Sequence, residues 1–175
     1  QVNEGNKIWD NVFGFAFFDH REFHDFLQQN NIELIVKLHP AEEHLFADTL
    51  EKFDFVNLVT NKMLAENDLD MYETLGGIDL LITDYSSVYF DYLLLNKPII
   101  FTPTDLETYK QQRGLLFDYN KMTPGPKVTK QADLQNEILK YFLNSSYYEN
   151  DSTKIHITFK NFDWIWSVSF LFFIL

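Results

Sequence analysis

The sequence of 175 residues contains no cysteine. This absence excludes a disulfide-stabilised scaffold and a thiolate metal site. Basic residues are also scarce, since 14 Lys and Arg stand against 26 Asp and Glu, for a formal net charge of −12. A surface this acidic repels nucleic acid and anionic lipid headgroups at long range. If the ligand is a phosphate compound, local groups such as backbone amides and a few placed cations must attract it.

Metal-ligand patterns and a leader segment are missing as well. The five histidines share no metal-ligand spacing, and no glutamate completes a zinc helix around His20 and His24, which lie four residues apart. We therefore expect no metal. The amino terminus shows no signal peptide pattern. A start at Gln1 instead of Met suggests a fragment or an excised domain.

The most apolar segment lies at the carboxyl end. Residues 162–175, FDWIWSVSFLFFIL, carry a single charge at Asp163, but a helix that spans a membrane needs about 20 apolar residues and this segment is shorter. Three interpretations are open: a docked terminal segment, an interfacial segment, or a sequence artefact such as a frameshift. We therefore expect an atypical apolar tail over residues 149–175, after a main domain over residues 1–148.

Strand-like and helix-like segments alternate along the main domain. Continuous apolar runs predict buried strands at residues 32–38, 56–60, 79–83 and 97–103. Apolar residues at helical spacing occupy the intervening segments. This alternation predicts an α/β fold, a Rossmann-like parallel sheet with helices on both faces. In such sheets, ligands bind at the carboxyl ends of the strands.

Local signals place several element boundaries. Capping-box spacing predicts helix starts at Asp19 and Thr104. A short helix is expected over residues 67–75, and a deeply buried helix over residues 86–96. The segment LLFDY, residues 115–119, predicts a short strand.

The segment DLLITDYSSVYFD, residues 79–91, joins the third predicted strand to the buried helix. A helix that begins at Ser86 or Ser87 leaves backbone N–H groups unpaired, and the positive end of its dipole attracts an anion. Asp91 lies four residues after Ser87 on the same helical face, where its carboxylate could accept hydrogen bonds from a ribose beside a bound phosphate. The alternative is structural, with Ser86 as a helix cap and Asp91 bonded to a nearby loop.

A second polar motif, Lys37-Leu38-His39, closes the first predicted strand before Pro40. Alternation along a strand puts Lys37 and His39 on the same side. An imidazolium at this place could neutralise a phosphate or protonate a leaving group, although His39 could instead bond to the backbone of a tight turn. Arg113 can bind a phosphate through two nitrogens, or it can be an ordinary surface arginine.

Three blocks occur in order within residues 32–142: IVKLHP, DLLITDYSSVYFDYLLLNKPIIFTPTDLETYKQQRGLLFDY and PGP. In this combination the chain closely resembles the CDP-glycerol glycerophosphotransferase family, the bacterial primases and polymerases of wall teichoic acid and related polymers. The resemblance implies the carboxyl-terminal, nucleotide-binding half of a GT-B glycosyltransferase fold. It implies CDP-glycerol or CDP-ribitol as donor substrate, release of CMP, a lipid-linked acceptor and no cofactor. It also implies a peripheral location on the cytoplasmic face of the bacterial membrane.

The resemblance also implies roles for the residues of these motifs. Lys37 and His39 would contact the donor diphosphate, and His39 would stabilise or protonate the departing phosphate. Ser86 and Ser87 would bind phosphate and Asp91 would hold the ribose. Leu38 and Arg113 complete the predicted substrate-binding set.

Two features depart from the family pattern. The general base and one strand of the family lie in or near an amino-terminal half, which does not precede Gln1 here. After Tyr148 the chain no longer resembles the family. A partner half is therefore expected.

Three other functions remain open. One is a GT-B nucleotide-sugar transferase or epimerase, and another is a non-catalytic nucleotide-binding remnant. The third is a response-regulator receiver domain, in which Asp84 after its apolar strand would be the phosphoacceptor. A receiver domain also needs an acidic pair after its first strand and a lysine at a later strand end. Here the corresponding strands end in Lys-Leu-His and in Thr102-Pro103.

Overall fold

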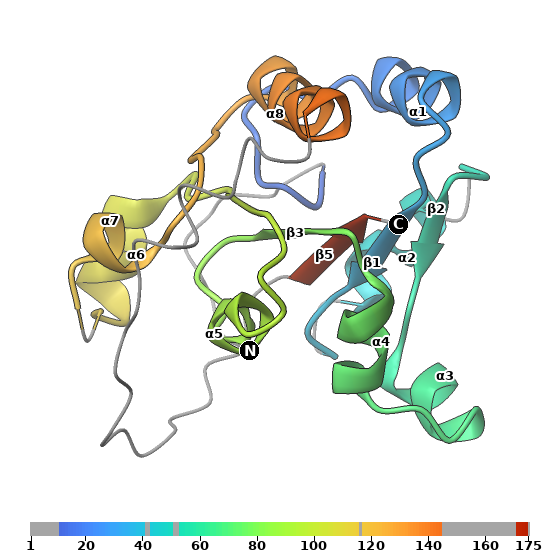
Figure 1. Ribbon diagram of the computed structural model, residues 1–175, viewed down its shortest axis with the longest axis horizontal. Coiled ribbons are helices and arrows are strands. Elements are labelled where there is room, and N and C mark those ends of the chain that lie inside the picture. The colour runs from blue at the N-terminus through green and yellow to red at the C-terminus, as the bar shows by residue number, and fades with distance from the viewer. Residues whose placement is uncertain (1–10, 41–42, 51–52, 116, 145–170, 175) are drawn as a thin grey trace.

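The computed structural model in Figure 1 describes residues 11–40, 43–50, 53–115, 117–144 and 171–174. The strands are β1 Leu34–Lys37, β2 Val56–Leu58, β3 Leu80–Thr83, β4 Ile99–Phe101 and β5 Leu171–Ile174. The helices are α1 His20–Gln29, α2 Glu43–Leu50, α3 Asn61–Glu66, α4 Met71–Gly77, α5 Val88–Leu93, α6 Leu106–Gln112, α7 Tyr119–Met122 and α8 Gln131–Leu143.

The strands form one sheet in the order β2-β1-β5-β3-β4. β1 pairs with β2 in parallel, and β3 pairs with β4 in parallel. The central strand β5 is antiparallel to both of its neighbours. The α/β class is confirmed, whereas the expectation of an entirely parallel sheet is wrong at its centre. Apolar runs predict burial, but they do not specify which strand lies beside which.

The four residues of β5 belong to the apolar carboxyl-terminal segment that the sequence left open. Both edges of β5 form hydrogen-bonded ladders, with β1 on one side and β3 on the other. Leu171–Ile174 is therefore docked in the sheet, as one of the three interpretations expected. Residues 149–170, the rest of the predicted tail apart from Leu175, lie outside the described residues.

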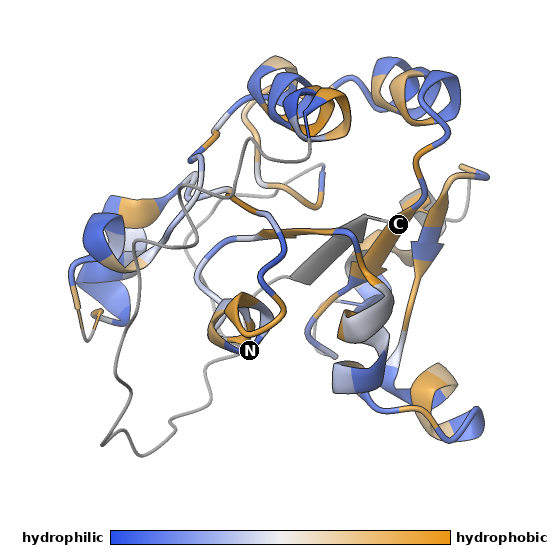
Figure 2. Ribbon diagram, in the orientation of Figure 1, coloured by the Kyte–Doolittle hydropathy of each residue, from blue (hydrophilic) through white to orange (hydrophobic). Residues whose placement is uncertain are grey.

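Alternating side chains of β3 enter two cores on opposite faces of the sheet. Leu80 and Ile82 belong to a core that also contains Phe23, Leu27, Phe46, Leu50, Leu134 and Ile138 from α1, α2 and α8. Leu81 belongs to the other core, with Leu75, Tyr89, Tyr92 and Tyr119 from α4, α5 and α7. Figure 1 shows α1 and α8 on one side of β3 and α5 on the other, and Figure 2 shows hydrophobic residues along β3. Helices therefore cover both faces of the sheet. Successive side chains of a strand point to opposite faces, so a strand with an unbroken run of apolar side chains is buried only when both faces are covered.

Several predicted boundaries can be compared with the structure. Asp19 caps α1 and accepts hydrogen bonds from the N–H groups of Arg21 and Glu22, so this helix start is confirmed. α4 begins at Met71, after a complete capping box at Asp70, four residues later than the predicted start. The N-cap of α6 is Asp105 instead of Thr104. No strand forms in the described part of residues 115–119, where Tyr119 begins α7.

Candidate functional site

The two polar motifs start from one edge of the sheet. Lys37, the last residue of β1, is in register with Leu171 of β5, and Thr83, the last residue of β3, is in register with the same Leu171. Neighbouring strands lie about 4.8 Å apart, so the two strand ends are about 10 Å apart. The Lys37-Leu38-His39 motif and the serine turn, which we define as residues 84–87, therefore flank one position at the carboxyl ends of β1 and β3.

The serine turn leads directly from β3 into α5. Ser86 is buried, and its Oγ accepts a long hydrogen bond of 3.4 Å from the N–H of Val88. Ser87 is the N-cap residue of α5, but its side chain makes no capping hydrogen bond, and it is half-buried. The structural alternative for Ser86 thus has one weak contact, while the hydroxyl of Ser87 is not used in capping.

Asp91 lies one turn further along α5 and is half-buried. Burial raises the pKa of its carboxyl group above the ordinary value. Its charge also raises the pKa of Tyr72 in α4, after the larger effect of burial on that tyrosine. Asp91 thus lies near enough to Tyr72 for its charge to act on that residue, one helical turn after Ser87.

Asp84 supports the serine turn from inside the protein. Its Oδ1 accepts a hydrogen bond of 2.5 Å from the N–H of Tyr85, and its carbonyl accepts one of 2.6 Å from Oη of Tyr119. Burial raises the pKa of the Asp84 carboxyl to about 8, against the lowering effect of the Tyr85 N–H, and Asp105 raises it further. A carboxyl group with this pKa is mostly protonated at neutral pH, so Asp84 adds little negative charge against an anion at the turn.

Lys37 is buried, and its ammonium group has two hydrogen-bond partners within the chain. Nζ donates to the carbonyl of Leu38 at 2.8 Å and to Oε1 of Glu43 at 3.2 Å. Glu43 begins α2, and its N–H donates to the carbonyl of the half-buried His39 at 3.2 Å. An anion that binds Lys37 would either share its ammonium group with Glu43 or replace Glu43 as its partner.

Leu38 belongs to the hydrophobic core and its side chain is 1% exposed. Any contact of this residue with a ligand must therefore come from its main chain. The sequence placed Leu38 in the substrate-binding set through its position between Lys37 and His39, and strand alternation turns its side chain to the other side of the sheet.

Arg113 is exposed at the C-cap of α6. Its guanidinium carbon lies 5.9 Å from the ring centroid of Tyr109, a distance at which cation–π attraction acts. Tyr109 in turn stacks on Tyr85 of the serine turn, with 4.0 Å between ring centroids and an interplanar angle of 22°. Sequence reasoning missed this connection. In the sequence, the only indication of this connection was that Tyr85 directly precedes the two serines.

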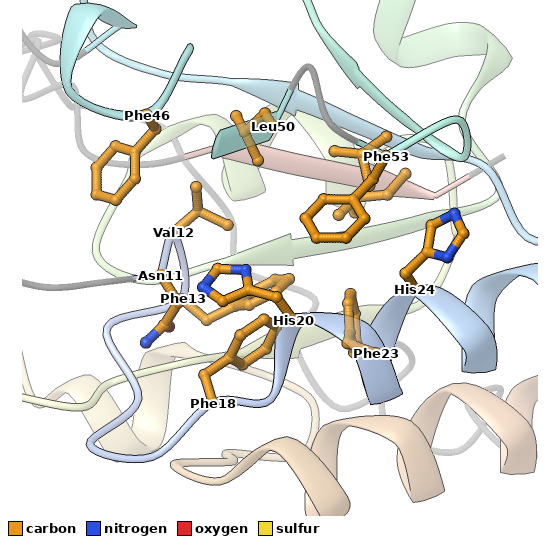
Figure 3. A pocket seen from close by; sticks show the side chains of 12 residues that line it. Asn11, Val12, Phe13, Phe18, His20, Phe23, His24, Phe46, Leu50 and Phe53 are labelled. Atoms are coloured by element: carbon orange, nitrogen blue, oxygen red, sulfur yellow. The ribbon is translucent and has the colours of Figure 1, made fainter. Parts of the chain in front are cut away.

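An apolar cavity of about 20 Å³ lies away from the strand ends, between α1 and α2. Figure 3 shows aromatic side chains around it, among them Phe18, Phe23 and Phe53, together with His20 and His24. Its size suits roughly one water molecule. None of the predicted site residues lines it, so it is not the candidate site.

Two further properties concern the described residues only. They contain no group of three or more His, Asp or Glu side chains that could hold a metal ion. They also contain no helix with the length and apolar character needed to cross a bilayer.

A sheet with polar side chains at the carboxyl ends of its strands is typical of ligand-binding α/β domains. The chain belongs to the CDP-Glycerol:Poly(glycerophosphate) glycerophosphotransferase family, whose model matches residues 6–163. This confirms the family predicted from the motifs.

Individual relatives agree with the family assignment. The chain is 41% identical over 105 residues to a teichoic acid glycerol-phosphate primase of Bacillus subtilis, a match that covers 60% of this chain and 26% of that protein. It is 34% identical over 127 residues to a teichoic acid poly(glycerol phosphate) polymerase of the same organism, covering 72% of this chain and 16% of that protein. The chain thus corresponds to about a quarter or less of these relatives.

A solved structure supports the fold. The chain is similar to the wall teichoic acid polymerase TagF, with a TM-score of 0.63 and 24% sequence identity over 88% of this chain and 35% of that one. At this identity the likeness shows the fold alone.

Proposed function

We propose that this chain is the donor-binding part of a polyol-phosphate transferase in teichoic acid synthesis. The observation that carries the proposal is the shared register of Lys37 and Thr83 with Leu171. Through it, the two motifs most specific to the family lie at one edge of the sheet. Membership of the glycerophosphotransferase family supports the reaction class.

The donor is CDP-glycerol or CDP-ribitol. Its diphosphate binds at Ser86 and Ser87, close to the end of β1, and Lys37 exchanges Glu43 for a phosphate oxygen. Asp91 accepts hydrogen bonds from the ribose hydroxyls. The uncharged state of Asp84 at neutral pH supports anion binding at the turn, because no buried carboxylate then opposes the donor charge.

The reaction is transfer of the polyol phosphate to a hydroxyl group. A terminal hydroxyl oxygen of the lipid-linked acceptor attacks the β-phosphorus, a new P–O bond forms, and the bond to the CMP phosphate breaks. His39 stabilises or protonates the departing CMP, while a base outside this chain takes the hydroxyl proton. Hydrogen bonds from the serines offset charge that develops in the transition state, which is the usual main contribution in phosphoryl transfer.

The proposal includes the partners that such a reaction needs. A second, amino-terminal half completes the cleft in a GT-B arrangement, and the assembled enzyme acts peripherally at the cytoplasmic face of the membrane, where the lipid-linked acceptor resides. No cofactor takes part, because the donor is already activated.

Isothermal titration with CDP-glycerol, CDP-ribitol, UDP-GlcNAc and CMP tests the function. We expect the CDP-polyols to bind, and a preference for UDP-GlcNAc would instead indicate a nucleotide-sugar transferase or epimerase. Incorporation of phosphate at Asp84 from acetyl phosphate would support a receiver domain. Donor binding without transfer after addition of the amino-terminal half and acceptor would indicate a non-catalytic remnant.

A substitution tests the serine turn directly. Ser87→Ala should weaken CDP-glycerol binding roughly tenfold, because a hydrogen bond to a charged group is lost, and should leave cytidine binding unchanged. Thr129→Ala, which removes an exposed hydroxyl elsewhere, is the matched control. Equal losses for CDP-glycerol and cytidine would contradict the assignment of the phosphate to this turn.

A further inference from the structure

Tyr85 connects the serine turn to α6 through two different contacts. Its hydroxyl group donates a hydrogen bond of 2.8 Å to Oδ1 of Asp105. Its ring stacks on Tyr109 at 4.0 Å with an interplanar angle of 22°. Tyr85 is 9% exposed, whereas Asp105 and Tyr109 are half-buried, so both contacts lie at the border between the interior and the surface.

The side chain of Asp105 contacts Tyr85 and does not cap its own helix, α6. An aspartate at an N-cap normally accepts hydrogen bonds from the first N–H groups of its helix. Asp105 is the N-cap of α6 but its side chain makes no such bond, and its Oδ1 accepts a hydrogen bond from Oη of Tyr85 instead. When an N-cap residue makes a tertiary contact in place of its capping hydrogen bonds, the position of the helix relative to its neighbour matters in addition to the formation of the helix.

The contacts of Tyr85 lie on the face of α6 that carries Arg113. The N–H of Tyr109 donates to the carbonyl of Asp105 at 2.9 Å, and the N–H of Arg113 donates to the carbonyl of Tyr109 at 2.9 Å. These three residues therefore follow one another at intervals of four on one face of the helix. Tyr85 contacts the first two directly, and the third lies over the ring of Tyr109 at 5.9 Å.

We propose that Tyr85 is a positioning residue that sets the place of Arg113 relative to Ser86 and Ser87. Tyr85 is the direct neighbour of Ser86, so the turn that holds the donor phosphate and the helix that carries the cation are joined by one side chain. Tyr85 itself does not contact the donor. It acts by fixing α6, so that the guanidinium of Arg113 reaches the same donor phosphates. This inference rests on the proposed function for its ligand.

Hydrogen exchange on the full chain tests the positional link without a ligand. Tyr85→Phe keeps the ring and removes the bond to Asp105, and we expect amide exchange within α6 to become about threefold to tenfold faster. Tyr92→Phe is the matched control, because it removes another buried hydroxyl, which donates to the carbonyl of Ile78 at 3.0 Å, and should leave α6 unchanged. Unaltered exchange in α6 of Tyr85→Phe would overturn the inference.

A double-mutant cycle then tests whether Tyr85 acts through Arg113. The affinity for CDP-glycerol is measured for the unchanged chain, Tyr85→Phe, Arg113→Ala and the double variant. In the chain that keeps Arg113, we expect Tyr85→Phe to weaken donor binding about threefold to tenfold. In the Arg113→Ala background, we expect Tyr85→Phe to have no further effect on donor binding. Additive losses would refute the positioning role.

The two arms separate failure of this inference from failure of the proposed function. If the unchanged chain does not bind CDP-glycerol, the proposed function is overturned and Tyr85 has no role toward that donor. The exchange result still decides whether Tyr85 holds α6. If the unchanged chain binds the donor and the cycle is additive, the proposed function stands and the inference on Tyr85 falls.

Discussion

Asp84 makes the stability of this protein depend on pH in an unusual direction. A carboxyl group in the unfolded chain titrates near 3.8, whereas burial raises the pKa of Asp84 in the folded chain to about 8. Between these values the folded protein holds one more proton than the unfolded chain. The free energy of unfolding must therefore fall as pH rises through this window, by up to about 1.4 kcal/mol per pH unit from this group.

Asp84→Asn removes the titration and keeps an oxygen that can accept the N–H of Tyr85. Because the amide cannot ionise, we expect the variant to become more stable than the unchanged protein as pH rises. Between pH 5 and pH 7 the difference in free energy of unfolding should shift in favour of the variant by roughly 2–3 kcal/mol.

Urea denaturation at pH 5, 6 and 7 measures this difference, with the slope against urea checked for constancy. Asp54→Asn is the control, because Asp54 is exposed and its substitution also removes one carboxyl group, at a place away from the buried turn. A constant difference between Asp84→Asn and the unchanged protein over this range would show that folded Asp84 is ionised. The account of an uncharged acid beneath the serine turn would then be wrong.

Two further predictions concern the sheet. Gly125 has a positive φ of 133°, and a Cβ there would collide with the carbonyl oxygen of Ile99, so Gly125→Ala should destabilise the fold by about 2 kcal/mol or more in thermal unfolding. Gly76→Ala, with open space around its Cβ, should not. Phe172→Pro should lower the denaturation midpoint more than Phe172→Ala, because proline removes an N–H from the central strand; equal midpoints would contradict the place of β5.

Much of the α/β pattern could be predicted from the sequence. Four of the five predicted strands each contain an observed strand, and the Asp19 cap formed as expected. These features depend on interactions between residues that are close in the sequence. The spacing of apolar residues and the identity of the capping residues can therefore be recognised from the sequence alone. Helix α3, which Thr60 caps through a hydrogen bond from Met63, was missed because its polar sequence has little helical periodicity.

The candidate site divides in the same way. The motifs around Lys37 and around Ser86 could be placed at strand ends from the sequence, because strand–helix junctions follow from local pattern. The partner of Lys37 could not, since the contact with Glu43 depends on how α2 turns back toward β1. The bond between Tyr85 and Asp105 joins residues 20 positions apart, and helix-capping rules predicted Thr104, not Asp105, as the N-cap of this helix.

The sequence by itself determined the α/β class, the family and the two motifs at the strand ends, because each is encoded in short stretches of residue type and spacing. Only the tertiary structure decided that β5 lies between β1 and β3, that burial raises the pKa of Asp84, and that Tyr85 joins the serine turn to α6. These properties arise from contacts and burial through space. In the segment of residues 79–91, Asp84 and Tyr85 therefore acquire roles that residue spacing alone does not specify.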